Sequence, residues 1–236
     1  MAAVVKTGSA SRRSALRAIL YNNGLSLVVF TLFCLFMAGQ AITGFKENNS
    51  ELQDHGRPPL AFSTYLTSGH FIEATAENWE SEFLQMAAYV LFTSFLYQRG
   101  SAESKKLGEQ EAVDRDPRRA KNKKGAPWPV RRGGWVLRVY ENSLSLTFLL
   151  LFLISFALHA VGGARETSEE QIEHGGHAVG VLEYVSSSRF WFESLENWQS
   201  EFLALGAMAV LSIYLRQRGS PESKPVDAPH TQTGAE

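Results

Sequence analysis

Apolar residues run without a charge through two long stretches, at 25–42 and 144–161. Each stretch is long enough to cross about 30 Å of hydrocarbon as a helix. Two shorter uncharged runs, at 83–97 and 202–215, reach that length if their helices begin earlier in the chain. The pattern therefore predicts an all-α polytopic membrane protein with four transmembrane helices, near residues 21–44, 76–98, 138–163 and 195–217.

The same order of polar and apolar residues occurs twice, and adding 119 to a residue number in the first copy gives its counterpart in the second. The matched strings are "YNNGLSL" at Tyr21 with "YENSLSL" at Tyr140, "ENWESEFL" at Glu77 with "ENWQSEFL" at Glu196, and "QRGSAESK" at Gln98 with "QRGSPESK" at Gln217. Self-similarity at a fixed period indicates a tandem duplication, here of a two-helix unit. Because each unit crosses the membrane an even number of times, we expect parallel repeats related by a pseudo-two-fold axis.

Lysine and arginine are distributed unevenly between the predicted loops. The central connection, Arg99 to Arg138, carries twelve of them, whereas the two loops between paired spans hold only Lys46, Arg57, Arg165 and Arg189. Positive residues are enriched in cytoplasmic loops. The sequence therefore predicts a multi-pass membrane protein with both termini in the cytoplasm.

Composition and charge divide the chain into five segments. We expect a basic cytoplasmic tail at 1–20, membrane repeat 1 at 21–105, a flexible charged cytoplasmic linker at 106–139, membrane repeat 2 at 140–224 and a disordered tail at 225–236. The net charge of −1 argues against a nucleic-acid partner. The expected partners are the lipid bilayer and, because four spans are few for a transporter, a second copy of the chain or other membrane proteins.

The repeated motif before each second span mixes polar residues with apolar ones. Thr75 and Ser194 stand where a residue would cap a helix that runs through the motif. Trp79 and Trp198 follow at the depth where tryptophan prefers the headgroup boundary, so we interpret them as interface anchors. The segments 64–74 and 183–193 are expected to form short interfacial helices, with a plain exposed loop as the alternative.

Two polar pairs in this motif are less easily explained by the end of a helix. Asn78 with Glu82, and Asn197 with Glu201, are spaced four residues apart and so share one helix face. A carboxylate at the hydrocarbon edge is a candidate functional group. The four residues are therefore a candidate site for proton or cation handling, and the alternative is that they only join helices by hydrogen bonds.

Histidines supply the other candidate chemistry. His55, His174 and His177, with Asp54 and Glu173, could ligate a divalent metal at the outer face, although the spacing of a known zinc motif is missing. No cofactor is otherwise predicted. His159 aligns with Gln40, so a polar group occurs at the same depth of both halves and is expected to hydrogen-bond between helices.

Several strings resemble a bacterial family of integral membrane proteins that is classified as a domain of unknown function. They include "ENWESEFLQMAAYVLFTSFLYQRGSAESK", "SLSLTFLLLFLISFALHAVGGAR" and "FWFESLENWQSEFLA", and the resemblance covers nearly the whole chain. The family assigns no activity, substrate or catalytic residue. The resemblance therefore implies a bacterial inner-membrane location and no functional residues.

Two classes of function are compatible with these observations. The first is a non-enzymatic membrane protein, either a small transporter or channel or a scaffold, for which Glu82 and Glu201 matter most. The second is a membrane-embedded metal-dependent enzyme that uses the outer histidines and carboxylates. We interpret the chain as a member of the first class, and no catalytic residue is assigned.

Overall fold

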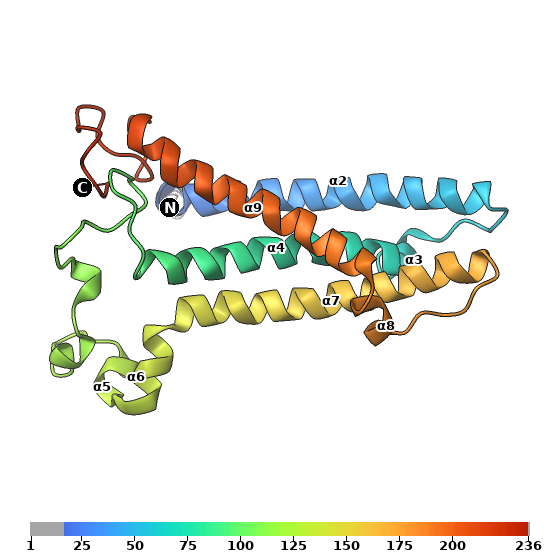
Figure 1. Cartoon of the computed structure of the whole chain (residues 1–236), viewed down its shortest axis with the longest axis horizontal. Coiled ribbons are helices and arrows are strands. Elements are labelled where there is room, and N and C mark those ends of the chain that lie inside the picture. The colour runs from blue at the N-terminus through green and yellow to red at the C-terminus, as the bar shows by residue number, and fades with distance from the viewer. Residues whose placement is uncertain (1–16, 236) are drawn as a thin grey trace, which may run out of the picture. The chain divides into compact units, whose positions relative to one another are not determined.

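The computed structural model describes residues 17–235, and all regular structure in that range is helical. The predicted all-α class is therefore confirmed. The basic tail expected at 1–20 lies mostly outside the described residues. The main helices are α2 (Gly24–Asp54), α3 (Phe62–Tyr65), α4 (Gly69–Thr93), α7 (Ser143–Glu173), α8 (Val181–Val185) and α9 (Ser188–Tyr214) (Figure 1).

The chain divides into two compact units, Met1–Thr67 and Ser68–Glu236, and each is described by itself. In the first unit, the loop after α2 folds back onto the end of that helix. The side chain of Asn49 accepts a hydrogen bond from the backbone N–H of Leu60 at 2.7 Å and donates to its carbonyl at 3.2 Å. Phe45 packs edge-on against Phe62 and Tyr65. These contacts fix α3 against the end of α2.

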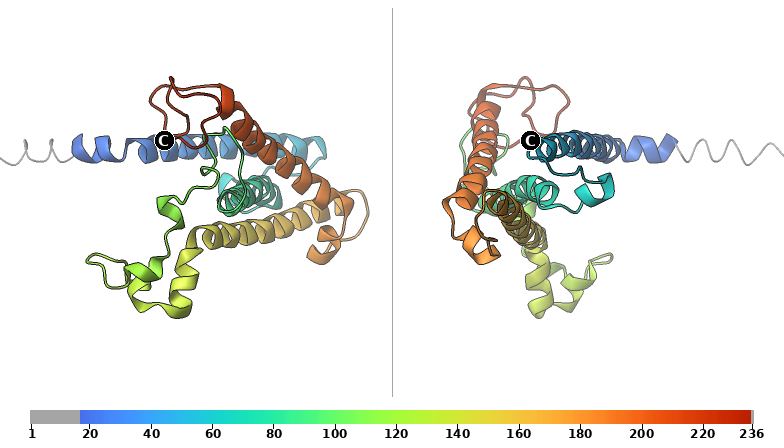
Figure 2. Two further views of the ribbon diagram at one scale, coloured as in Figure 1. Left: turned by 60° about the vertical axis from the view of Figure 1, so that its left-hand side comes forward. Right: turned by 90° about the vertical axis from the view of Figure 1, so that its right-hand side faces the viewer.

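In the second unit, α4 and α7 lie side by side and run in opposite directions (Figure 1). The start of α4 at Gly69 lies beside Gly162, late in α7, and Phe83 packs against Phe148, early in α7. Helix α9 crosses α4 obliquely, as two further views show (Figure 2). A buried cluster of Ala160, Ala164, Tyr184 and Phe190 forms the core where α7, α8 and α9 meet.

The N-caps of α4 and α9 lie seven residues before Thr75 and Ser194, so that predicted pair of caps is wrong. The N-caps are Ser68 and Ser187, whose hydroxyls each accept a hydrogen bond from the backbone N–H three residues later, at 3.3 Å. A serine oxygen satisfies a donor at the helix start. Of the segments expected to form short interfacial helices, 69–74 and 188–193 belong to α4 and α9, whereas 64–65 and 183–185 belong to the short helices α3 and α8.

Helices α2 and α7 also extend beyond the ends expected at 44 and 163. Both end at a histidine, His55 or His174, whose ring Nδ1 donates to the carbonyl four residues earlier at 2.9 and 2.8 Å. The next residues, Gly56 and Gly175, have φ of +73° and +78°, which favours glycine. A donor from the side chain and a left-handed glycine together end a helix.

The repeated "QRGSxESK" strings form the same turn in both copies. Gly100 and Gly219 have φ of +83° and +85°, and the hydroxyls of Ser104 and Ser223 accept from the backbone N–H of Gln98 and Gln217 at 3.0 and 2.9 Å. The two copies of the sequence therefore encode one local conformation twice.

The linker and the C-terminal tail contain more structure than the sequence predicted. The linker includes the short helices η1 (Ala112–Asp114), η2 (Pro117–Ala120), α5 (Trp128–Arg132) and α6 (Gly134–Glu141). Lys105 pairs with Asp114 at 2.7 Å. The tail beyond 224, which we expected to be disordered, instead surrounds Lys224, whose ammonium donates to the carbonyls of Gly100, His230 and Gln232 at 2.6 to 3.0 Å.

Two of the described helices, α2 and α7, are long and apolar enough to cross a membrane. Only 17 % of the most apolar part of α7 is buried, whereas the core helix of a soluble protein would be mostly buried. Helices α4 and α9 have 25 and 27 residues, which is a sufficient length, but they carry several carboxylates.

Candidate functional site

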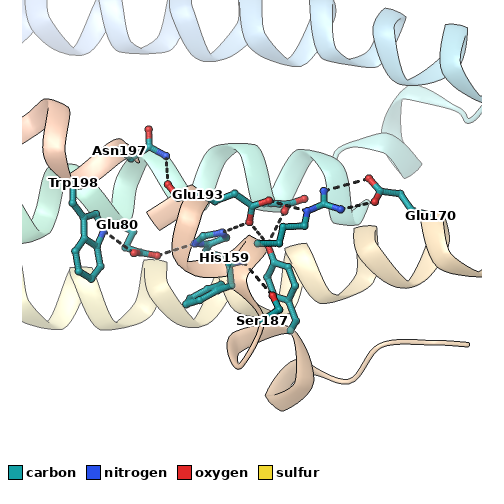
Figure 3. Close-up of polar contacts among 11 residues, drawn as sticks. Glu80, His159, Glu170, Ser187, Glu193, Asn197 and Trp198 are labelled. Carbon is teal, nitrogen blue, oxygen red and sulfur yellow. Dashed lines mark hydrogen bonds and ion pairs between the residues drawn. The ribbon is translucent and has the colours of Figure 1, made fainter. Parts of the chain in front are cut away.

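A buried histidine lies between helices in the second unit. His159, on α7, has no exposed surface, and its ring Nδ1 lies 2.9 Å from Oε2 of Glu80, on α4. The other oxygen of Glu80 accepts a hydrogen bond from the indole N–H of Trp198, on α9, at 2.8 Å (Figure 3). The interhelical hydrogen bond expected for His159 is therefore confirmed, and it joins three helices.

The second ring nitrogen of His159 faces two more carboxylates. Nε2 lies 3.5 Å from Oε2 of Glu193, within the distance of an ion pair, but it has no hydrogen-bond partner among the described residues. The phenol of Tyr184 is within hydrogen-bond distance of Glu193 and, at 2.9 Å, of Glu73. One hydroxyl has one proton to donate, so it satisfies only one of these carboxylates at a time.

Arginine supplies the permanently charged cation of this group. The Nε of Arg189 donates to Oε1 of Glu193 at 2.9 Å, and its guanidinium also pairs with Glu170, as drawn in Figure 3. We call Glu73, Glu80, His159, Glu170, Tyr184, Arg189, Glu193 and Trp198 the His159 cluster. Burial and the hydrogen bond with Glu193 raise the pKa of Tyr184 well above its usual value, so the phenol remains a donor at neutral pH.

Small residues on α7 allow the cluster to assemble. A Cβ atom at Gly162 would lie 2.6 Å from the backbone nitrogen of Glu73, so only glycine permits the observed approach of α4. A Cβ at Gly163 would lie 2.2 Å from the phenol oxygen of Tyr184. Phe190 stacks on the ring of His159 with a centroid separation of 4.7 Å. Close backbone packing and ring stacking thus fix the position of His159.

The asparagines of the predicted site have a local role. The amide of Asn78 donates to the carbonyl of Ala74 at 2.8 Å, and that of Asn197 donates to the carbonyl of Glu193 at 3.1 Å. Each of these hydrogen bonds is made to the preceding turn of the helix and does not involve Glu82 or Glu201. The amide bonds backward because the carbonyl four residues before lies within reach of a short side chain.

Glu82 and Glu201, the glutamates of the predicted site, lie on α4 and α9. Their charges are close enough to interact. The side chain of Gln85 donates to the backbone carbonyl of Glu201 at 2.9 Å, which joins the two helices at this level. Glu82 is exposed and Glu201 is half-buried. The structure therefore places the two glutamates near each other but outside the His159 cluster.

The predicted tryptophan anchors, Trp79 on α4 and Trp198 on α9, are both half-buried. Trp198 donates its indole N–H to Glu80, so part of its polar edge is used inside the protein.

The predicted metal ligands form separate local contacts. His55 and His174 bond to the ends of their own helices, and His177 lies 3.4 Å from Glu183 with both side chains largely exposed. Asp54 and Glu173 are the exposed last residues of α2 and α7. Within residues 17–235, the one group of three metal-ligating side chains is instead Glu73, His159 and Glu193.

Sequence reasoning missed Glu73, Glu80 and Glu193 because it selected positions that are identical in the two halves. The counterparts of these glutamates are Phe192, Gln199 and Ala74, so these three members of the cluster occupy positions at which the halves differ. One signal was available. Glu73, Glu77 and Glu80 follow a spacing of four and three, which places carboxylates on one face of α4.

The His159 cluster combines an imidazole, four carboxylates, one phenol and one guanidinium. Buried carboxylates are costly unless paired, and Arg189 is shared between Glu170 and Glu193. Negative charge therefore exceeds the formal positive charge around His159. Such an excess of carboxylates favours the binding of a cation or of a proton.

Comparisons with known proteins give one match. A family model described as a domain of unknown function (DUF6766) matches residues 16–235. No curated protein and no solved structure matches the chain.

Proposed function

The chain belongs to the DUF6766 family, a domain of unknown function, and we propose that it is a small channel- or transporter-like protein that handles cations in the bacterial inner membrane. The observation that carries the proposal is the buried His159 cluster between helices of membrane length. Ionisable groups inside a membrane bundle are costly, and they commonly mark an ion or substrate pathway.

The outward surface of the second unit supports a lipid environment. Large apolar side chains are exposed along α7 and α9, among them Leu150, Leu153, Leu158, Leu203, Val210 and Leu211. A contiguous apolar surface of this kind calls for a partner or a membrane. We infer that α4 and α9 also cross the membrane, with Glu73, Glu80 and Glu193 facing the protein interior, which gives four spans in all.

The equal spacing of the helices supports the duplication. Helices α2 and α7 have 31 residues each, and their first residues, Gly24 and Ser143, are 119 positions apart. The same shift relates the starts of α4 and α9. The parallel arrangement of two repeats proposed here would put equivalent ends of these helices at the same membrane face.

We propose that Glu82 and Glu201 form a second negatively charged position for a cation, in addition to the His159 cluster. They lie on helices that also contribute Glu80 and Glu193, and their mutual repulsion favours a shared cation. A cation that leaves the His159 cluster would therefore find another negatively charged position between α4 and α9.

Flux measurements on reconstituted protein test the proposal. Proteoliposomes loaded with ion-sensitive dyes should take up at least one of K⁺, Na⁺, Mn²⁺ or Zn²⁺ faster than empty liposomes. The double variant Glu82→Gln and Glu201→Gln, and separately His159→Gln, should lower that rate at least tenfold.

Glu196→Gln is the matched control. Glu196 is an exposed carboxylate on α9, one turn after Glu193 and outside the cluster. Its replacement should leave the rate unchanged. Uptake equal to that of empty liposomes for every cation in the panel would refute the proposed function.

A further inference from the structure

We propose that Glu73, His159 and Glu193 bind one divalent transition-metal ion of the Zn²⁺ or Mn²⁺ type. The three residues come from α4, α7 and α9, so the ion would join the three long helices of the second unit. The role of this ion in cation handling rests on the proposed function. Binding of the ion is measured separately, without a transport assay.

The spacing of the three groups suits a metal. One ligand atom from each residue lies within 4.8 Å of the other two, and Nε2 of His159 is 3.5 Å from Oε2 of Glu193. Ligands at about 2.0–2.2 Å from a tetrahedral ion are separated by roughly 3.4 Å. The histidine and Glu193 are therefore already at the separation that a shared ion requires.

An unsatisfied nitrogen points at the site. Nε2 of His159 is fully buried and has no hydrogen-bond partner among the described residues, which is costly for a polar atom. The opposite nitrogen, Nδ1, faces Glu80, which can only accept when ionised. Nδ1 therefore carries a proton, and when Nε2 is unprotonated the ring presents a lone pair toward the Glu193 carboxylate. Two acceptors that face each other require either a proton or a metal ion between them.

The surroundings match those of metal-bound histidines. Such a histidine usually donates its other ring N–H to a carboxylate, which fixes the tautomer and the ring. Glu80 takes this role and is itself held by the indole N–H of Trp198 at 2.8 Å (Figure 3). On the other side, Arg189 holds the second oxygen of Glu193. The remaining oxygen of Glu193 faces both His159 and the phenol of Tyr184.

The ligand set selects the class of ion. One imidazole nitrogen with carboxylate oxygens suits first-row transition metals, whereas Ca²⁺ and Mg²⁺ favour oxygen alone. Three protein ligands leave a fourth position open, as in sites that exchange or use their ion. The side chain of Glu193 is 18 % exposed, whereas His159 is fully enclosed, so the ion would enter past Glu193.

Binding is tested on the full chain in mild detergent. After removal of metal with a chelator, titration with Zn²⁺ should show one equivalent bound per chain and a raised Tm. Glu73→Gln and Glu193→Gln keep the shape of the side chain and should lose stoichiometric binding. Glu80→Gln, which weakens the support of His159, should lower the affinity by about 10- to 100-fold.

Two controls separate a built site from general attraction of cations. Glu196→Gln should bind Zn²⁺ as the wild type does, and Ca²⁺ should bind at least tenfold more weakly than Zn²⁺. If the wild type binds less than one equivalent, or if Glu73→Gln and Glu193→Gln bind as tightly as it does, the site is refuted and His159 is instead a protonated ring between carboxylates.

The two proposals fail in different ways. Zn²⁺ binding in detergent without cation flux in liposomes would keep the metal site and refute transport. Flux of K⁺ or Na⁺ by a protein that binds no Zn²⁺ would keep the proposed function and refute the metal site.

Discussion

Gly162 controls how closely α4 and α7 approach each other. A Cβ atom there would lie 2.6 Å from the backbone nitrogen of Glu73 and 3.0 Å from its Cα. A flexible side chain could rotate away from such a contact, but the backbone of a packed helix cannot. One missing methyl group thus determines whether Glu73 reaches the His159 cluster.

Gly162→Ala should therefore destabilise the protein by about 1–3 kcal/mol, the usual cost of overpacking. The measurement is the thermal unfolding of the purified chain in detergent. The matched control is Gly206→Ala in α9, because no described residue lies within 4 Å of a Cβ built there. That variant should be neutral or slightly more stable, since alanine favours a helix by about 0.8–1.0 kcal/mol over glycine. Equal effects of the two substitutions would contradict the close contact.

At the scale of elements, the last lysine of the "QRGSxESK" turn has different partners in the two copies. Lys105 and Lys224 occupy equivalent positions of the repeat, and both follow the same serine-stabilised turn. Lys105 forms a surface ion pair with Asp114. Lys224 is 1 % exposed and donates only to backbone carbonyls, most of them in the C-terminal tail. The tail is thus attached through one buried ammonium group.

Replacing Lys224 should release that tail. Lys224→Met removes three charged hydrogen bonds, each of which contributes about 1.5–3 kcal/mol. We expect the amides of 225–235 to lose their protection from hydrogen exchange and the tail to become accessible to proteases.

Lys105→Met provides the control at the equivalent position. An exposed ion pair contributes at most about 1 kcal/mol, so this variant should leave the tail protected. Unchanged exchange in Lys224→Met, or equal release in both variants, would show that the tail is held by other contacts.

At the scale of the whole molecule, the proposed four spans predict a definite orientation. The connection containing Asn122 is rich in lysine and arginine, and the loop containing Arg57 holds few. Positive residues near the ends of spans remain on the cytoplasmic side. Both termini and the central connection should therefore lie in the cytoplasm.

Reporter fusions check this orientation. A reporter that is active only outside the cytoplasm should be active when it is fused after Arg57 and silent when it is fused after Asn122. A reporter active only in the cytoplasm should give the complementary pattern. If the outside reporter is active at Asn122 and silent at Arg57, the orientation is the opposite of the predicted one. If the results are equal at both positions, Arg57 and Asn122 lie on the same side of the membrane, and the second predicted span does not cross it.

Local interactions determined what the sequence by itself could predict. The apolar runs and the 119-residue period predicted four long helices, and α2, α4, α7 and α9 are present with different bounds. The observed helix ends differ from the predicted ones because a helix continues until it reaches a capping group. Ser68, Ser187, His55 and His174 are such groups, and each acts within four residues of its own position.

The tertiary structure alone decided which side chains meet. His159 was recognisable as a polar group inside an apolar helix, but Glu80 is 79 positions away and belongs to a helix with three other glutamates between 73 and 82. The crossing of α4, α7 and α9, fixed by close contacts such as that of Gly162, selects Glu73 and Glu80 from this group and brings Glu193 to the same ring. Comparison of the two copies of the repeat identifies equivalent positions, whereas a site depends on which residues lie close together. Here the residues that lie close together do not occupy equivalent positions.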